Sequence, residues 1–237
     1  MAGKQRSKVT ADVKRNRLYI TISSDPGKSV LAKIYTDVRF CVADLKPGFD
    51  VVTDLSLCSI GHLNGVSTMR KIMDYLIAHQ VGQVVRVLGK KSLLFKQAVR
   101  ATALFQSYSP AYVATLQEAE NKLTHSARRN GLRFQLHRQL VRYSINQKEG
   151  EGQIRDISIS GCSVQAATIP PAADMNISLF LRFHQGRKTA VSFTISAKVV
   201  RAQDDTFAAQ FMDLGDDQKG ELYKCLAGEA RRDIPRE

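Results

Sequence analysis

Three arginines and a short acidic motif are the residues of this chain best suited to bind a ligand. Arg128 and Arg129 come first, and Arg133 completes an R-x-x-x-R pattern with Arg129. A guanidinium is flat, carries parallel donors that match a guanine N7/O6 edge or a phosphate, and stacks on purines. A D-x-S-x-x-G motif begins at Asp156, 23 residues beyond Arg133. This combination indicates a site for an anionic ligand that carries purine bases.

Each motif also has an ordinary structural explanation when it stands alone. Arginines four residues apart are common on solvated helices, and the Asp and Ser of D-x-S-x-x-G usually bond nearby backbone in a turn. The order of the two motifs, at the start of a segment with strand periodicity, favours the binding interpretation. In that interpretation Asp156 accepts from guanine N–H donors or orients an arginine, Ser158 adds a hydroxyl, and Gly161 lets the backbone approach a base closely.

The two motifs resemble those of PilZ domains, and the resemblance extends over roughly residues 126–229. It implies a receptor for the bacterial second messenger cyclic di-GMP that is not an enzyme and has no catalytic residue, metal or cofactor. The implied ligand-binding residues are Arg128, Arg129, Arg133, Asp156, Ser158 and Gly161. Two glycines that are usual in the family are replaced here, one by Cys162 and one within Phe207–Ala209, both outside the binding motifs.

Arg128 bears on the number of ligands. This arginine resembles the one that PilZ proteins have at the same position when they capture two mutually intercalated cyclic di-GMP molecules. A stacked ligand pair concentrates four phosphate charges, and a third cation relieves their repulsion. The alternative is that Arg128 points to solvent. We expect two ligands per chain.

The segment after about residue 124 has the alternating pattern of antiparallel strands. Apolar and polar residues alternate over Val191–Val199 and over Met175–Phe183, where Phe180 is the one exception. Further strands are expected at Leu140–Ile145 and Phe207–Phe211, and a closing helix at Gln218–Ala227. This half is therefore predicted to be an all-β, PilZ-like antiparallel barrel with a closing helix.

The first half alternates strands with helices, which is typical of an α/β domain with a mixed or largely parallel sheet. Expected strands are Arg17–Ser23, Phe49–Asp54, Gln83–Leu88 and Tyr112–Ala114. A helix is expected on the apolar stripe Leu31, Ile34, Val38, Cys41 and Leu45, a second with Ser67 or Thr68 as its N-cap, and a third from Ser92. Thr115 and Glu118 form a capping box for a fourth.

The stretch Val51–Ser56 followed by Gly65 resembles the STAS domain of anti-sigma-factor antagonists, over roughly residues 8–123. The position of the family's phosphorylated serine is held by Leu63, which has no hydroxyl. A phosphorylation switch therefore cannot operate there, and Ser67 or Thr68 serve better as helix caps. The expected role of this STAS-like half is to dock an unidentified protein partner or a second copy of the chain.

The formal net charge of +13 favours an anionic partner, which includes nucleic acid as a third interpretation. Aromatic residues are only 7% of the chain and Trp is absent, so few platforms exist for stacking bases, and no specific nucleic acid is expected. No apolar run has the length of a signal peptide or a membrane span, so we expect a cytoplasmic protein. The four cysteines are scattered and fit small buried groups better than disulfides or metal ligands.

The expected organisation is a STAS-like domain at 1–123 and a PilZ-like domain at 124–237, whose first residues, 124–133, form the arginine-bearing linker. Ligand binding is expected to pin this linker across the barrel and so rearrange the two domains. The alternative is a regulator that works through protein contacts alone, with a STAS-like module and a PilZ domain that binds no ligand.

Overall fold

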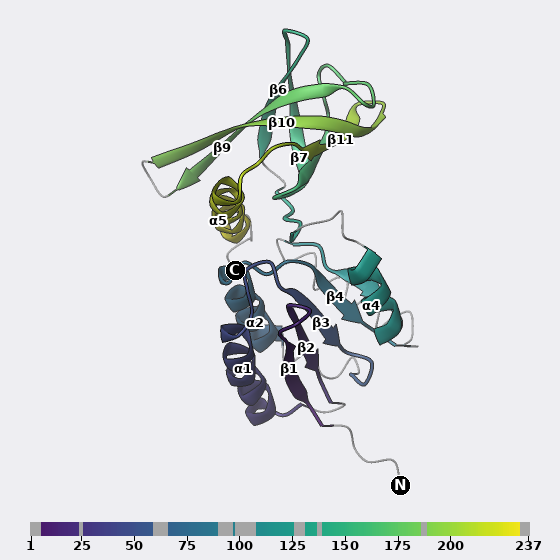
Figure 1. Ribbon diagram of the computed structural model, residues 1–237, viewed down its shortest axis with the longest axis vertical. Helices are drawn as coiled ribbons and strands as arrows, with labels where there is room; N and C mark the ends of the chain where they lie inside the picture. The colour runs from purple at the N-terminus through teal and green to yellow at the C-terminus, as the bar shows by residue number, and fades with distance from the viewer. Residues whose placement is uncertain are drawn as a thin grey trace. The chain divides into compact units, whose positions relative to one another are not determined.

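The computed structural model describes residues 6–23, 26–58, 66–89, 97, 108–125, 131–136, 139–185 and 189–232. The chain divides into two compact units (Figure 1). One unit comprises Met1–Phe105 and Pro110–Leu132, and the other comprises Gln106–Ser109 and Arg133–Glu237. The chain therefore passes between the units three times. Of the predicted helix from Ser92 only Gln97 is described, and it is helical, whereas the Leu63 position lies outside the described residues.

The N-terminal unit is built on a five-stranded mixed sheet. Its order is β1 (Lys8–Asp12), β2 (Arg17–Thr21), β3 (Asp50–Asp54), β4 (Val84–Val87) and β5 (Ala111–Val113). Strands β1 and β2 are antiparallel, and each later neighbour is parallel. The predicted α/β fold is confirmed, whereas β1 was not among the predicted strands.

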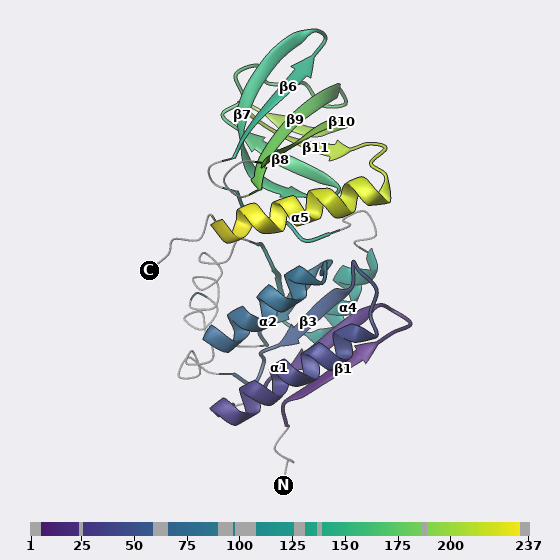
Figure 2. The same cartoon turned by 90° about the vertical axis from the view of Figure 1, so that its left-hand side faces the viewer.

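Helices cover both faces of this sheet. Helices α1 (Lys28–Ala43) and α2 (Val66–Ala78) lie on one face and α4 (Leu116–His125) on the other (Figures 1 and 2). Helix α4 buries Ala119 and Leu123 against valines of β3 and β4. Successive residues of β3 point to opposite faces of the sheet, so the side chains of Val51 and Val52 face different helical layers.

Three local predictions for this unit can be compared with the structure. The buried stripe of α1 is Leu31, Ile34, Val38 and Val42, so Val42 takes the place predicted for Cys41, which is partly exposed. Helix α2 begins at Val66, which puts Ser67 and Thr68 inside its first turn rather than at the predicted N-cap. The capping box is confirmed on its first half, because the Thr115 hydroxyl accepts from the Glu118 N–H at 3.1 Å. The Glu118 carboxylate accepts from the Ala114 N–H at 2.9 Å instead of that of Thr115.

The C-terminal unit is a closed antiparallel barrel followed by a helix, as predicted. Its strands are β6 (Leu140–Ile145), β7 (Lys148–Ser158), β8 (Gly161–Gln165), β9 (Asn176–Gln185), β10 (Thr189–Gln203) and β11 (Thr206–Phe211). They close in the order β10-β11-β8-β7-β6-β9. Helix α5 (Asp216–Arg232) lies along this barrel (Figure 2) and extends beyond the predicted ends.

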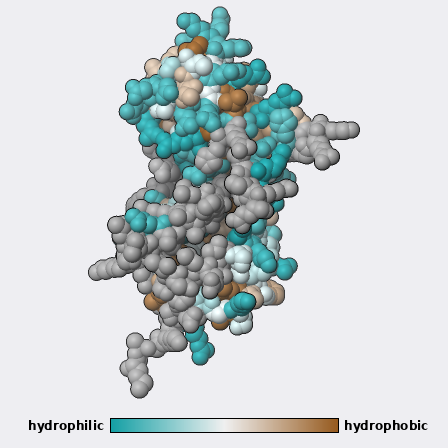
Figure 3. All heavy atoms as spheres, turned by 180° about the vertical axis from the view of Figure 1, so that it is seen from behind, coloured by the Kyte–Doolittle hydropathy of each residue, from teal (hydrophilic) through white to brown (hydrophobic). Residues whose placement is uncertain are grey.

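The barrel core follows the alternation of its strands. Leu179, Leu181 and Phe183 of β9 are buried, while Phe180 between them is 38% exposed, as its exceptional position in the pattern indicates. Helix α5 buries Leu222, Tyr223 and Leu226 among others. In the view of Figure 3 the coloured surface of this unit is mostly hydrophilic, with apolar atoms in small separate patches. Among the helices of the described ranges, none combines the length and the apolar composition that a membrane span requires.

Candidate ligand-binding site

The D-x-S-x-x-G motif forms the hairpin between β7 and β8. Asp156 and Ser158 end β7, Ile159 and Ser160 make the turn, and Gly161 begins β8. The pairing shifts register between Ile154 and Asp156, which marks a β-bulge that leaves Arg155 as the extra residue. A bulge reverses which face later side chains occupy. Ile154 and Ile157 are therefore both buried, and Asp156 lies on the outer side with 21% of its side chain exposed.

The second arginine of R-x-x-x-R is held against this hairpin through its neighbour. Phe134 donates to the Ile157 carbonyl at 2.8 Å and accepts from the Ile157 N–H at 2.9 Å. The Phe134 ring is fully buried and meets Tyr223 of α5 edge-on at a centroid distance of 5.4 Å. Because an antiparallel partner runs in the opposite direction, this pairing sets Arg133 opposite Ser158 and within reach of Asp156.

Arg133 and Asp156 form an ion pair. The Arg133 Nη1 donates to Asp156 Oδ1 at 2.5 Å, with 45% of the Arg133 side chain and 21% of the Asp156 side chain exposed. The fold thus brings together two groups that lie far apart in the sequence and leaves both accessible to solvent. A guanidinium beside a carboxylate can offer donors to a phosphate or a guanine edge and acceptors to guanine N–H groups.

Ser158 and Gly161 also stabilise the structure of the hairpin itself. The Ser158 side chain is buried; its hydroxyl accepts from the Ser160 N–H at 3.2 Å and donates to the Gly161 carbonyl at 3.3 Å. A Cβ at Gly161 would lie 2.4 Å from the Ala209 carbonyl oxygen of β11. Glycine at this position therefore permits the close approach of β8 and β11. Both residues fix the shape of the turn that carries Asp156.

Of the six predicted binding residues, the structure brings Arg133, Asp156, Ser158 and Gly161 into one region, and Arg128 and Arg129 lie outside the described residues. Sequence reasoning missed Phe134, the residue that anchors the arginine segment. Its signal was present, because Leu132, Phe134 and Leu136 are apolar and alternate with polar residues, and all three are buried.

Cys162 follows the motif and is unsuited to chemistry. Burial first, and then the nearby Asp156 carboxylate, raise the pKa of its thiol to about 12. A thiol with so high a pKa is protonated at neutral pH and is a poor nucleophile. Within the described part of the chain, no group of three or more His, Cys, Asp or Glu side chains is placed to hold a metal ion.

A second polar cluster lies in the N-terminal unit. Arg17 is 6% exposed and donates to the Glu120 carboxylate of α4 at 2.6 Å, and the Tyr19 hydroxyl donates to the other Glu120 oxygen at 2.7 Å. Burial and the bond to Glu120 raise the pKa of Tyr19. These bonds join α4 to β2.

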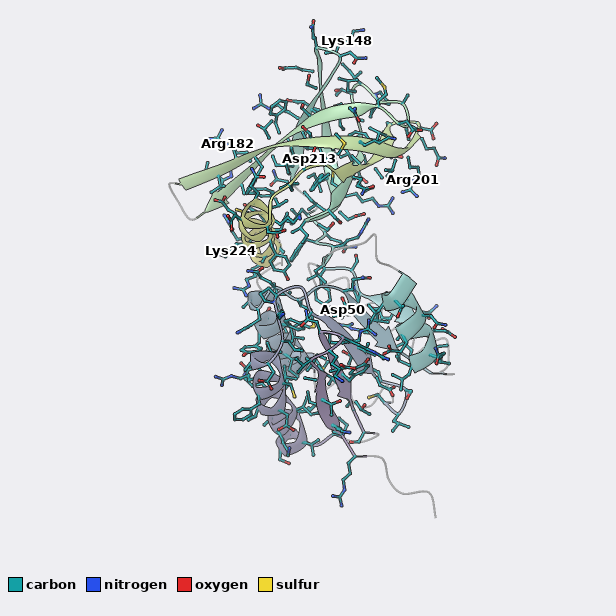
Figure 4. All side chains as sticks on the ribbon, viewed as in Figure 1. Asp50, Lys148, Arg182, Arg201, Asp213 and Lys224 are labelled. Atoms are coloured by element: carbon teal, nitrogen blue, oxygen red, sulfur yellow. The ribbon has the colours of Figure 1, made fainter. Side chains whose placement is uncertain are left out.

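Basic side chains on the barrel unit are distributed over several elements. Figure 4 shows Lys148 at the tip of the β6–β7 hairpin, Arg182 on β9 and Arg201 on β10, with Lys224 on α5. These four exposed cations belong to four different elements of the barrel unit.

Comparison with known proteins matches residues 127–228 to the PilZ domain family. One similar solved structure is the PilZ domain of CeSA from a cellulose-synthesising bacterium, at 13% identity and a TM-score of 0.31, covering 38% of this chain and 90% of that one. An uncharacterised Legionella protein has 18% identity and a TM-score of 0.30, with 42% and 95% covered. The Borreliella burgdorferi PlzA protein in complex with c-di-GMP has 12% identity and a TM-score of 0.33, with 48% and 45% covered.

No curated protein matches the chain. The family match covers both the arginine motif and the β7–β8 hairpin, and it ends within α5. The C-terminal half of this chain therefore contains a PilZ domain, at residues 127–228.

Proposed function

We propose that the chain is a cyclic di-GMP receptor whose binding site is formed by R-x-x-x-R and the β7–β8 hairpin. The observation that carries the proposal is the ion pair between Arg133 and Asp156, one residue from each motif, inside a PilZ domain. PilZ domains are generally non-catalytic receptors. The ligand carries two phosphates and two guanines, which call for the donors and acceptors that these motifs supply.

Each residue has a proposed role in that site. Arg129 and Arg133 contact guanine edges or phosphates, and Arg128 adds a third cation for a second ligand. Asp156 accepts from guanine N–H donors. Ser158 and Gly161 maintain the turn that presents Asp156, a role supported by their contacts within the hairpin.

The energy of the ion pair leaves room for a ligand to replace it. An ion pair with partners this exposed contributes about 0–1 kcal/mol to stability. A bidentate arginine contact to guanine discriminates against another base by about 1–3 kcal/mol. Replacing the ion pair with such a contact therefore costs the protein little, and it makes Asp156 available for guanine N–H groups.

The proposed output is a change in how the N-terminal unit is presented to a partner. We place the domain boundary after residue 123, so that 124–133 belongs to the receptor domain, and we assign the N-terminal α/β unit to a STAS-like docking role. Its mixed sheet with helices on both faces supports that assignment. The ligand can shift the arrangement only by its differential affinity for the two states.

A competition assay tests the ligand. Fluorescently labelled cyclic di-GMP should bind the full chain and be displaced by unlabelled cyclic di-GMP. Cyclic di-AMP should compete far more weakly, because adenine has no O6 acceptor and presents an N6 donor toward arginine. Equal competition by cyclic di-AMP would mean that the site recognises the phosphates and does not distinguish guanine from adenine. Absence of any binding by the folded protein would favour the regulator that acts through protein contacts alone.

A further inference from the structure

Tyr108 and Ser109 precede β5 in the sequence, yet they belong to the barrel unit. Tyr108 is 2% exposed and forms an antiparallel bridge with Phe134. Ser109 donates its backbone N–H to the Arg133 carbonyl at 3.0 Å. Phe134 in turn is bridged to Ile157 of β7. The backbone around Arg133 is thus held between β7 and a piece of chain that comes from more than 20 residues upstream.

The sequence around this segment suits the pairing. Pro110 follows Ser109, and a residue before proline is restricted to extended backbone, the conformation that pairing requires. Pro110 itself has no N–H to satisfy. Only Ser109 and Pro110 separate Tyr108 from β5, which is paired with β4 in the N-terminal sheet. Any displacement of β5 relative to the barrel must therefore be absorbed by these two residues or by the bridge.

We propose that Tyr108 and Ser109 form a positioning segment, which holds Arg133 for the ligand and couples the N-terminal unit to the cyclic di-GMP site. The inference rests on the proposed function and extends it to the regulation of that site. A side chain whose backbone is fixed loses less freedom on binding, so a paired Arg133 binds more tightly than an unpaired one. Coupling is reciprocal, so a ligand that binds the Arg133 side chain also strengthens the bridge next to β5.

The deciding experiment removes one N–H. Ser109→Pro deletes the donor to Arg133 and keeps the extended backbone of Tyr108, whereas the control Ser109→Ala keeps the donor. One backbone hydrogen bond corresponds to about a 2- to 10-fold change in affinity. We expect Ser109→Pro to weaken cyclic di-GMP binding by that factor and Ser109→Ala to bind like the wild type.

A double-mutant cycle separates positioning from general destabilisation. If Ser109 acts through Arg133, Ser109→Pro should cost affinity in the wild-type background and cost nothing further on Arg133→Ala. An equal loss on both backgrounds, or none on the wild type, overturns the proposal. Should Ser109→Pro fail to fold, Tyr108→Ala removes the buried ring and keeps both N–H groups, and the same cycle applies.

A measurement without ligand keeps this inference distinct from the proposed function. Hydrogen exchange on the full chain should show faster exchange of the Phe134 and Ile157 amides in Ser109→Pro than in Ser109→Ala, at unchanged global stability. Unchanged exchange means that the segment does not hold Arg133. A wild-type chain that binds no cyclic di-GMP contradicts the proposed function, independently of the hydrogen-exchange result.

Discussion

Arg133 is the residue on which the proposed site depends most directly. Its carbonyl is fixed by the Ser109 N–H, while its side chain is 45% exposed and pairs with Asp156. The backbone is thus ordered before any ligand arrives, and only the side chain has to exchange partners. A ligand contact at this position is made without the cost of ordering the main chain.

Replacing Arg133 should therefore weaken binding without unfolding the protein. We predict that Arg133→Ala costs about 1–3 kcal/mol of cyclic di-GMP affinity, the range for one bidentate guanine contact. The matched control is Arg142→Ala, which removes an exposed cation of β6 outside both motifs. Equilibrium dialysis should show a loss for Arg133→Ala alone; an equal loss in both variants would mean that net charge matters rather than the site.

Arg128 makes a separate prediction about stoichiometry. Arg128→Leu should shift the ratio from two ligands per chain to one while retaining binding, because the third cation that offsets the charge of a stacked pair is gone. Titration at protein concentrations far above the dissociation constant measures the ratio. A wild-type chain that saturates at one ligand contradicts this role.

The approach of Arg133 to Asp156 could be anticipated from the two motifs, but the means of bringing them together could not. An unbroken strand would put Ile154 and Asp156 on the same face, and the bulge at Arg155 separates them. The break in alternation between Ile154 and Ile157, three residues apart and both buried, was its only signal in the sequence. The bridge from Tyr108 to Phe134 joins segments distant in sequence, and local periodicity carries no information about such partners.

At the scale of elements, the predicted bounds of strands with clear alternation lie close to the observed bounds. Strand β6 was predicted at Leu140–Ile145 and is observed there. Strand β1 was missed because Lys8–Asp12 has no strict alternation, and its residues are only partly buried at the edge of the sheet. The N-cap of α2 was misplaced because Ser67 and Thr68 are good capping residues, yet the helix begins before them.

Gly161 allows an element-scale test of stability. Gly161→Ala places a methyl group 2.4 Å from a backbone oxygen of β11 that belongs to a paired strand and cannot yield cheaply. We predict a loss of about 1–3 kcal/mol in the free energy of unfolding, the usual range for overpacking. Gly220→Ala in α5 is the control, since a Cβ there meets nothing within 4 Å and alanine favours helix by about 0.5–1 kcal/mol. Urea unfolding should move the two midpoints in opposite directions; a neutral Gly161→Ala would refute the packing role.

For the whole molecule, the sequence predicted a mixed α/β domain followed by an antiparallel barrel, and both are present. Single-sequence reasoning did not assign Gln106–Ser109 to the barrel unit, because that segment lies between elements of the first half. The net charge of +13 was a weaker guide, since it favours several kinds of anionic partner and identifies none.

The proposed STAS-like role makes a prediction for the N-terminal unit, because Leu63 holds the position of that family's phosphorylated serine. A serine-phosphorylation switch cannot operate there, so protein purified from its native host should carry no regulatory phosphate between Leu63 and Thr68. Ser67 and Thr68 lie in the first turn of α2, with Ser67 exposed, and are the hydroxyls to monitor by mass spectrometry. Stoichiometric phosphate on either one that alters partner binding would show that this half is switched by phosphorylation after all.

A calorimetric titration of the full chain measures directly whether cyclic di-GMP binds at the two motifs. We expect a saturable heat with two ligands per chain, which is strongly reduced in Arg133→Ala and preserved in Arg142→Ala. A folded wild-type chain that gives no saturable heat, or an Arg133→Ala variant that titrates like the wild type, would contradict it.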